Sequence, residues 1–297
     1  MKIIDAHMHY YNKEGFIEVA KRAGYTNTAE CWQKICQENN IVFSVAMGNT
    51  MYTSSRYGGV APRLIDLAGT FDENNYNQPQ NMGYCLGVRS TEMTEADGEK
   101  TAREFEFYLK QEHCLGLKLY PGYEPVYVND KRHWPLFELA EAYGVPVVIH
   151  TGDTARPDGL LKYSHPLTID DAAVNFRKVN FVIAHCGCPW FIDAAEVAGK
   201  NPNVSIDLSG LLEGNPKPLV VYHKFQSIWR KLHDSLNYFG DYSRIMYGSD
   251  WPLVNIPAYI RLISYVVPEE HHEAVFYKNA VRIFNRIPKL LDLENRG

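Results

Sequence analysis

Short apolar runs alternate along the chain with longer segments in which apolar residues recur at helical spacing. Segments such as TAREFEFYLKQEH, WPLFELAEAYG and PLVVYHKFQSIWRKLHDSLNYFG show the period typical of amphipathic helices. The runs that we interpret as strands lie at 2–7, 41–47, 84–89, 115–120, 145–150, 180–185, 203–208 and 244–249. Eight strands that alternate with helices within 297 residues predict an α/β fold, the (β/α)8 TIM barrel.

The main alternative to a barrel is an open, doubly wound sheet. The chain contains no GxGxxG segment, which is the dinucleotide-binding fingerprint of many such sheets. Two long polar stretches, at 48–81 and 151–168, each lead straight back into a predicted strand. We therefore expect one domain over residues 1–297, in which these two stretches form most of the pocket that selects the substrate.

Side chains able to bind a metal stand at the ends of the predicted strands. His7 and His9 close the first run, His150 the fifth and His185 the sixth, and Asp250 follows the eighth. Each residue alone has a structural explanation, since a histidine at a strand end is commonly a hydrogen-bonding residue and an aspartate can cap a turn. Because the carboxyl ends of barrel strands form one face, all five are expected to converge there. Their joint position favours a metal site.

Composition and charge argue against some classes of binding partner. Hydrophobic residues make up 45% and charged residues 22%, the formal net charge is −5, and no run of Lys and Arg occurs. Nucleic acid and an anionic membrane surface are therefore not the expected partners. No apolar run reaches membrane-spanning length, and the six cysteines form no CxxC pair, so we expect a cytoplasmic protein with reduced thiols.

The segments DAHMH, GLKLYP, VVIHTGD, FVIAHCG and YGSDWP, in this order and spacing, resemble the amidohydrolase superfamily. Within it they are similar to the amidohydrolase-2 or ACMSD-like branch of metal-dependent hydrolases and decarboxylases, as is the closing KNAVRIFN. The resemblance spans the whole chain. It implies that His7, His9, His150 and Asp250 hold one divalent metal ion, with zinc expected. It also implies that His185 acts on substrate or water, and it makes a homodimer a candidate assembly.

Three functions are compatible with this residue set. In the first, water activated by the metal attacks an amide, lactone or ester-like bond of a small polar substrate, with His185 polarising the substrate and Asp250 moving a proton. The second is nonoxidative decarboxylation of an aromatic or dienoic carboxylate by the same residues. A binding barrel without catalysis is less favoured, because every ligand residue is present.

Further residues are candidates for contact with substrate. Arg89 ends the third run and would clamp a substrate carboxylate or pair with a loop acid. Lys118 corresponds to the strand-four lysine that is carboxylated in binuclear members of the superfamily. We favour instead a lysine that pairs with an internal carboxylate or meets an anionic substrate, and we expect one metal. His165 lies in the loop after the fifth run, and Trp251 would line the pocket or pack in the core. Asp207 would orient a ligating histidine or cap its strand.

Overall fold

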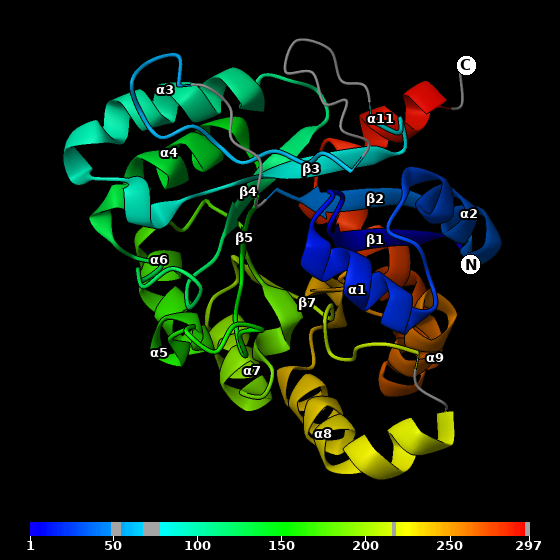
Figure 1. Cartoon of the computed structure of the whole chain (residues 1–297). Helices are drawn as coiled ribbons and strands as arrows, with labels where there is room; N and C mark the ends of the chain where they lie inside the picture. Colours follow the sequence, from blue (N-terminus) through cyan, green and yellow to red (C-terminus); the bar gives the residue numbers. More distant parts are fainter. Residues whose placement is uncertain (49–54, 68–77, 216–217, 295–297) are drawn as a thin grey trace.

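The computed structural model describes residues 1–297 except 49–54, 68–77, 216–217 and 295–297, and for 218–225 and 292–294 it gives only the backbone. Eight parallel strands follow one another in sequence order around a single sheet (Figure 1). They are β1 (Ile3–Met8), β2 (Ile41–Met47), β3 (Met82–Gly87), β4 (Cys114–Leu119), β5 (Val147–Ile149), β6 (Phe181–Ile183), β7 (Val204–Asp207) and β8 (Ile245–Met246).

Backbone hydrogen bonds between β1 and the segment after β8 complete the cylinder. The Asp250 N–H donates to the carbonyl of His7 at 2.8 Å, and the His9 N–H donates to the carbonyl of Trp251 at 2.8 Å. The predicted TIM barrel is therefore confirmed. These bonds also place the two N-terminal histidines directly beside Asp250, although the two segments lie at opposite ends of the sequence.

Helices surround the sheet (Figure 1). They are α1 (Glu14–Ala23), α2 (Ala29–Asn39), α3 (Gly98–Leu109), α4 (Trp134–Tyr143), α5 (Leu161–Ser164), α6 (Asp170–Asn175), α7 (Phe191–Lys200), α8 (Pro218–Phe239), α9 (Ile256–Val266), α10 (Asn279–Ile283) and α11 (Ile287–Glu294). Local signals fix their ends: α4 stops at Gly144 with φ 61°, and the Asn255 side chain accepts the Ala258 N–H at the start of α9. Across the part of the chain that is described, no helix has both the length and the apolar character needed to cross a bilayer.

Apolar side chains fill the barrel below its carboxyl-terminal mouth. Ile4, Phe43 and Val182 of three strands form one buried apolar cluster with Phe284, which follows α10, and Ile287 of α11. A second apolar cluster lies between the strands and the outer helices. Because the barrel interior is packed, a ligand that enters the barrel is expected at the carboxyl ends of the strands.

Candidate metal centre

Three ligand-type atoms from both ends of the chain meet at the mouth of the barrel. Nε2 of His9 lies 3.0 Å from Oδ1 of Asp250, and Nε2 of His7 lies 3.6 Å from the same oxygen. All three residues are buried, and their ligand atoms lie within 4.8 Å of one another. Oδ1 of Asp250 has no hydrogen bond of acceptable geometry within the described residues. A buried carboxylate oxygen without a donor, faced by two imidazole nitrogens, fits a divalent cation.

A second carboxylate, Asp5, ties together the two segments that supply these ligands. Its Oδ1 accepts the backbone N–H of His7 at 3.3 Å and that of Ser249 at 2.9 Å. Burial raises the pKa of Asp5 to about 7, in spite of these donors. The chain then turns at Asp250, whose φ of 61° aims its side chain differently from that of a continuing strand.

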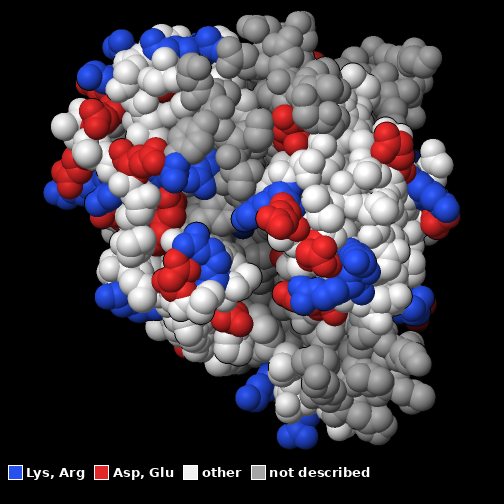
Figure 2. Space-filling model, in the orientation of Figure 1, with Lys and Arg blue, Asp and Glu red and all other residues white. Residues whose placement is uncertain are grey.

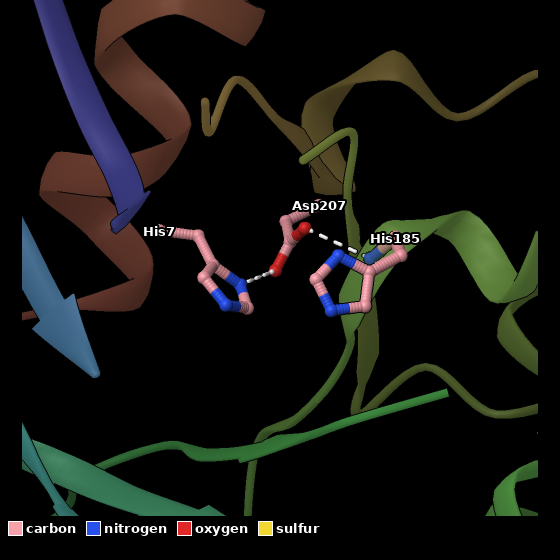
Figure 3. A group of neighbouring side chains, drawn as sticks. All are labelled: His7, His185 and Asp207. Atoms are coloured by element: carbon pink, nitrogen blue, oxygen red, sulfur yellow. Dashed lines mark hydrogen bonds and ion pairs between the residues drawn. The ribbon is translucent and has the colours of Figure 1, made fainter. Parts of the chain in front are cut away.

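Asp207, at the end of β7, holds the ring of His7. Its Oδ2 lies 2.8 Å from Nδ1 of His7 (Figure 3). A carboxylate accepts hydrogen bonds, so Nδ1 of His7 carries the proton and Nε2 keeps a lone pair. This is the arrangement in which an outer carboxylate orients a metal-binding imidazole. The geometry corresponds to the orienting role that we considered for Asp207 from the sequence.

The electrostatics keep these groups in the protonation states that metal binding needs. Burial, followed by the nearby Lys118, lowers the pKa of His7 to about 4. Burial alone would raise the pKa of Asp250, but the attraction of His9, His185 and His7 holds that pKa well below its usual range. At neutral pH the imidazole of His7 is neutral and Asp250 is ionised, as metal ligands must be.

His185 lies beside the three-atom cluster. Its ring centroid is 4.9 Å from that of His7 and 5.0 Å from that of His150. The backbone of His185 has φ 60° and that of the next residue, Cys186, has φ 47°, so the chain bends sharply where the strand ends. Burial lowers the pKa of His185, which leaves a neutral imidazole at pH 7.

His150 occupies the same face but does not join the cluster. Neither of its ring nitrogens belongs to the groups of potential ligand atoms that lie within 4.8 Å of one another in the described chain. Its Nε2 is 3.0 Å from the carbonyl oxygen of Asp153. A carbonyl only accepts, so Nε2 is the protonated nitrogen and Nδ1 is the one with a lone pair. The fourth ligand expected from the sequence stays a prediction.

Lys118, on β4, is fully buried beneath the site. Its Nζ lies 3.5 Å from Nε2 of His7, and no carboxylate among the described residues lies within ion-pairing distance. Burial lowers its pKa to about 8, while the more distant charges of Asp207 and Asp250 act in the opposite direction. The close internal ion pair considered for this lysine is therefore absent from the described structure, and its cationic form still predominates at pH 7.

The site opens into a cavity of about 370 Å³. Its lining includes five basic side chains, two acidic ones and three aromatic ones: Lys13, Arg63, Arg89, Lys118 and Arg156; Glu124 and Asp250; Phe16, Tyr120 and Tyr123. Figure 2 shows basic and acidic side chains around a hollow on this view of the molecule. The carboxylate of Glu124 already accepts two hydrogen bonds, from the Ser90 N–H and from the Thr91 hydroxyl, each at 2.9 Å. The lining therefore has a surplus of positive charge.

Two residues expected to touch substrate do not line this cavity. Trp251 is fully buried, with its ring 5.0 Å from that of Trp32 on α2, and so packs in the core. His165 is half-buried with its ring 4.7 Å from that of Trp190. Of the two alternatives for Trp251, the structure therefore favours core packing, and contact of His165 with substrate stays a prediction, because position after a strand does not fix which way a side chain turns. Arg89 does line the cavity and also pairs with Glu92 at 2.9 Å.

Other lining residues were missed from the sequence. Lys13 and Phe16 belong to the segment that begins α1, and Tyr123 to the turn after β4. These residues follow strand ends, and that position was the feature of the sequence that could have identified them as lining the cavity. The stretch at 48–81 contributes Arg63, but part of it lies outside the described residues, and the stretch at 151–168 contributes Arg156.

Comparisons with known proteins agree with this architecture. The chain is similar to a probable 2-pyrone-4,6-dicarboxylic acid hydrolase from Acinetobacter baumannii with citric acid bound, at 16% identity and a TM-score of 0.63, covering 96% of this chain and 100% of that one. It is also similar to a dihydroxybenzoic acid decarboxylase from a Polaromonas species with bound manganese and the inhibitor 2-nitroresorcinol, at 14% identity and a TM-score of 0.61, covering 96% and 97%. An uncharacterized TIM-barrel protein from Bordetella bronchiseptica matches at 17% identity and a TM-score of 0.62, covering 97% and 100%. At these identities the similarity establishes the fold.

Sequence comparison adds the family. A search of curated proteins gave no match. A family model described as amidohydrolase matches residues 88–286, which is more than half of the chain. The chain therefore belongs to the amidohydrolase-2 family of metal-dependent hydrolases and decarboxylases.

Proposed function

We propose that the protein is a hydrolase that uses one divalent metal ion, with zinc expected, to cleave an amide, lactone or ester-like bond of a small anionic substrate. The observation that supports this most directly is the meeting of His7, His9 and Asp250 beside a cavity that His9 and Asp250 line. We include His150 as the fourth ligand, through the Nδ1 atom that its contact with Asp153 leaves unprotonated.

Each residue of the site has a separate role in the proposed reaction. When bound, the ion supplies Lewis acidity, which activates a water molecule and polarises a substrate oxygen. Asp250, which was expected from the sequence to move the proton, is a proposed ligand. We therefore assign the proton transfer to His185, a neutral imidazole at the cavity wall, which accepts the proton that the attacking water loses and returns it to the leaving group. Lys118 places a positive charge under the site, where negative charge develops during the attack.

The charge of the cavity supports an anionic substrate. Five basic side chains line it, while one of its two acids is engaged with Ser90 and Thr91 and the other belongs to the proposed ligand set. Arg89 and Arg156 are paired with the exposed acids Glu92 and Asp158. Such surface pairs contribute little, so a substrate carboxylate replaces them at small cost.

Decarboxylation of an aromatic carboxylate is the second candidate. It is favoured by the same cationic cavity and by the similarity to a decarboxylase of dihydroxybenzoic acid. The two reactions differ in products. Incorporation of one oxygen atom from labelled water into product supports hydrolysis, whereas release of carbon dioxide without such incorporation overturns it in favour of decarboxylation.

Metal analysis of the purified protein, followed by ligand binding, tests the proposal. We expect one divalent ion per chain, identified by mass spectrometry, and loss of the ion in His9→Ala. A value near two per chain, or no bound metal after incubation with zinc and with manganese, contradicts it. The melting temperature of the zinc-loaded protein should rise with benzoate and isophthalate but not with benzamide. An equal rise with benzamide contradicts an anionic substrate.

Two further properties remain proposals. We place the protein in the cytoplasm, which is supported by six free cysteines, most of them buried. A homodimer stays a prediction from the sequence, and the mass of the purified protein by light scattering tests it.

A further inference from the structure

The Nδ1 atom of His185 faces two oxygens of one residue, Ser209. The hydroxyl oxygen lies at 2.9 Å and the backbone carbonyl oxygen at 3.2 Å. Ser209 is fully buried, so water does not compete for these contacts. The carbonyl oxygen only accepts hydrogen bonds, and a proton on Nδ1 is therefore required for that contact.

The hydroxyl of Ser209 has only one proton, and it donates that proton in a hydrogen bond to Asp207. Oδ1 of Asp207 accepts the backbone N–H of His185 at 3.0 Å and that of Ser209 at 3.0 Å, and it also contacts the Ser209 hydroxyl. Backbone N–H groups only donate, so Oδ1 acts as an acceptor. The serine proton therefore points to Asp207, and its oxygen is left as an acceptor for Nδ1 of His185.

We propose that Ser209 is a positioning residue that transmits the charge of Asp207 to His185 and fixes its ring in the Nδ1–H form. The other nitrogen, Nε2, is then the unprotonated one, on a residue that lines the cavity. Figure 3 shows Asp207 between the two imidazoles, with the second nitrogen of each ring directed away from it.

One buried carboxylate thereby controls two histidines with different tasks. Through Oδ2, Asp207 sets the tautomer of His7 directly, and through Oδ1 and Ser209 it sets that of His185. Both rings keep a lone pair on Nε2, in the first as a proposed metal ligand and in the second as a proton acceptor. The inference rests on the proposed function for what His185 does with that lone pair, but the tautomer itself is independent of any reaction.

The experiment measures the tautomer of His185 by nuclear magnetic resonance. Protein labelled with 15N-histidine is studied before and after loading with one equivalent of zinc, and the His185 signals are assigned by their loss in His185→Gln. Long-range proton–nitrogen correlations distinguish the protonated nitrogen from the unprotonated one. The variants are Ser209→Ala, Ser209→Thr, and Ser205→Ala as a matched control, because Ser205 is a buried serine on β7, close to Ser209 in the sequence, whose hydroxyl contacts Asn180 instead.

We expect a protonated Nδ1 in the wild type and in Ser205→Ala. In Ser209→Ala the ratio of Nε2–H to Nδ1–H should rise about threefold to tenfold, since one acceptor is lost, and Ser209→Thr should restore the wild-type ratio. A wild-type His185 with its proton on Nε2, or an unchanged ratio in Ser209→Ala, overturns the inference. The wild-type measurement decides alone if the alanine variant does not fold. Absence of bound zinc or of hydrolysis would refute the proposed function and leave this result intact.

Discussion

Gly210 lies so close to Asp250 that a Cβ atom on it would stand 2.8 Å from Oδ2 of that carboxylate. The same atom would lie 2.7 Å from Nδ1 of His185, and Gly210 has φ 63°, a conformation that side chains disfavour. The absence of a side chain at this position is therefore a requirement of the site.

Substitution of Gly210 by alanine should displace the proposed ligand Asp250 and weaken metal binding at least tenfold. It should also lower the free energy of unfolding by about 1–2 kcal/mol from backbone strain alone. Zinc affinity by chelator competition and denaturant unfolding measure the two effects. Gly199→Ala is the control, because it lies on α7 with open space around it and should be neutral or slightly stabilising. Normal zinc affinity in Gly210→Ala would contradict the placement of Asp250 in the centre.

Replacing Asp207 by asparagine should weaken metal binding about tenfold to a hundredfold, although Asp207 is not among the proposed ligands. The change removes the charge that fixes Nδ1–H of His7 and so makes Nε2 a poorer donor to the metal. Zinc affinity is measured alongside Asp241→Asn, in which the altered carboxylate contacts Ser243 and Arg244. Equal affinities of both variants would show that the contact is structural only.

His9→Ala and His150→Ala should both lose the metal, the first because His9 belongs to the observed cluster and the second because His150 is the proposed fourth ligand. His9→Ala removes a member of the three-atom cluster, and we expect no stoichiometric zinc after dialysis. In His150→Ala we also expect loss of retained metal if Nδ1 of His150 completes the ligand set, as proposed. Elemental analysis of both variants decides the matter. Full retention in His150→Ala would restrict the ligand set to the cluster and leave His150 as a cavity residue.

His133 should make a destabilising contribution to the free energy of unfolding in mild acid. This ring is buried between the carbonyl of Val128 and the hydroxyl of Ser90, and burial lowers its pKa to about 4. Since the unfolded chain has a pKa near 6.5, it takes up the proton first as the pH falls. The contribution of His133 to the free energy of unfolding is complete above about pH 6.5 and is lost as the pH falls towards 4. The loss amounts to roughly 2 kcal/mol between pH 7.5 and pH 5.

Urea unfolding of the wild type and of His133→Asn at these two pH values isolates this contribution. The variant should be less stable at pH 7.5, because it loses two buried hydrogen bonds, but its stability should change less on acidification. An equal change in both proteins would assign the acid sensitivity to other groups.

The architecture was largely predictable because each buried strand leaves a continuous apolar run in the sequence. The run at 41–47 coincides with β2, and the fold follows from the alternation. The eighth strand is shorter than predicted, ending at Met246, because the chain after it bends to pair with β1. Local composition does not encode that long-range pairing.

The site was predictable as a set of strand ends but not as a set of contacts. His7, His9 and Asp250 meet as expected, whereas the orientation of His150 depends on the carbonyl of Asp153. The rotation of a side chain after a strand depends on its packing partners, as Trp251 shows against Trp32. Ser209 gave no signal, since a serine near a strand end is ordinary until its neighbours in space are known.

The hydrogen bonds between β1 and the segment after β8 have a consequence for biosynthesis. Asp5 accepts a hydrogen bond from Ser249, which is 244 residues further along the chain. During translation the histidine pair therefore leaves the ribosome long before the carboxylate that faces it is made. Nascent chains halted ahead of Asp250 would hold an incomplete site, so the finished protein must acquire its cation late in synthesis or after release.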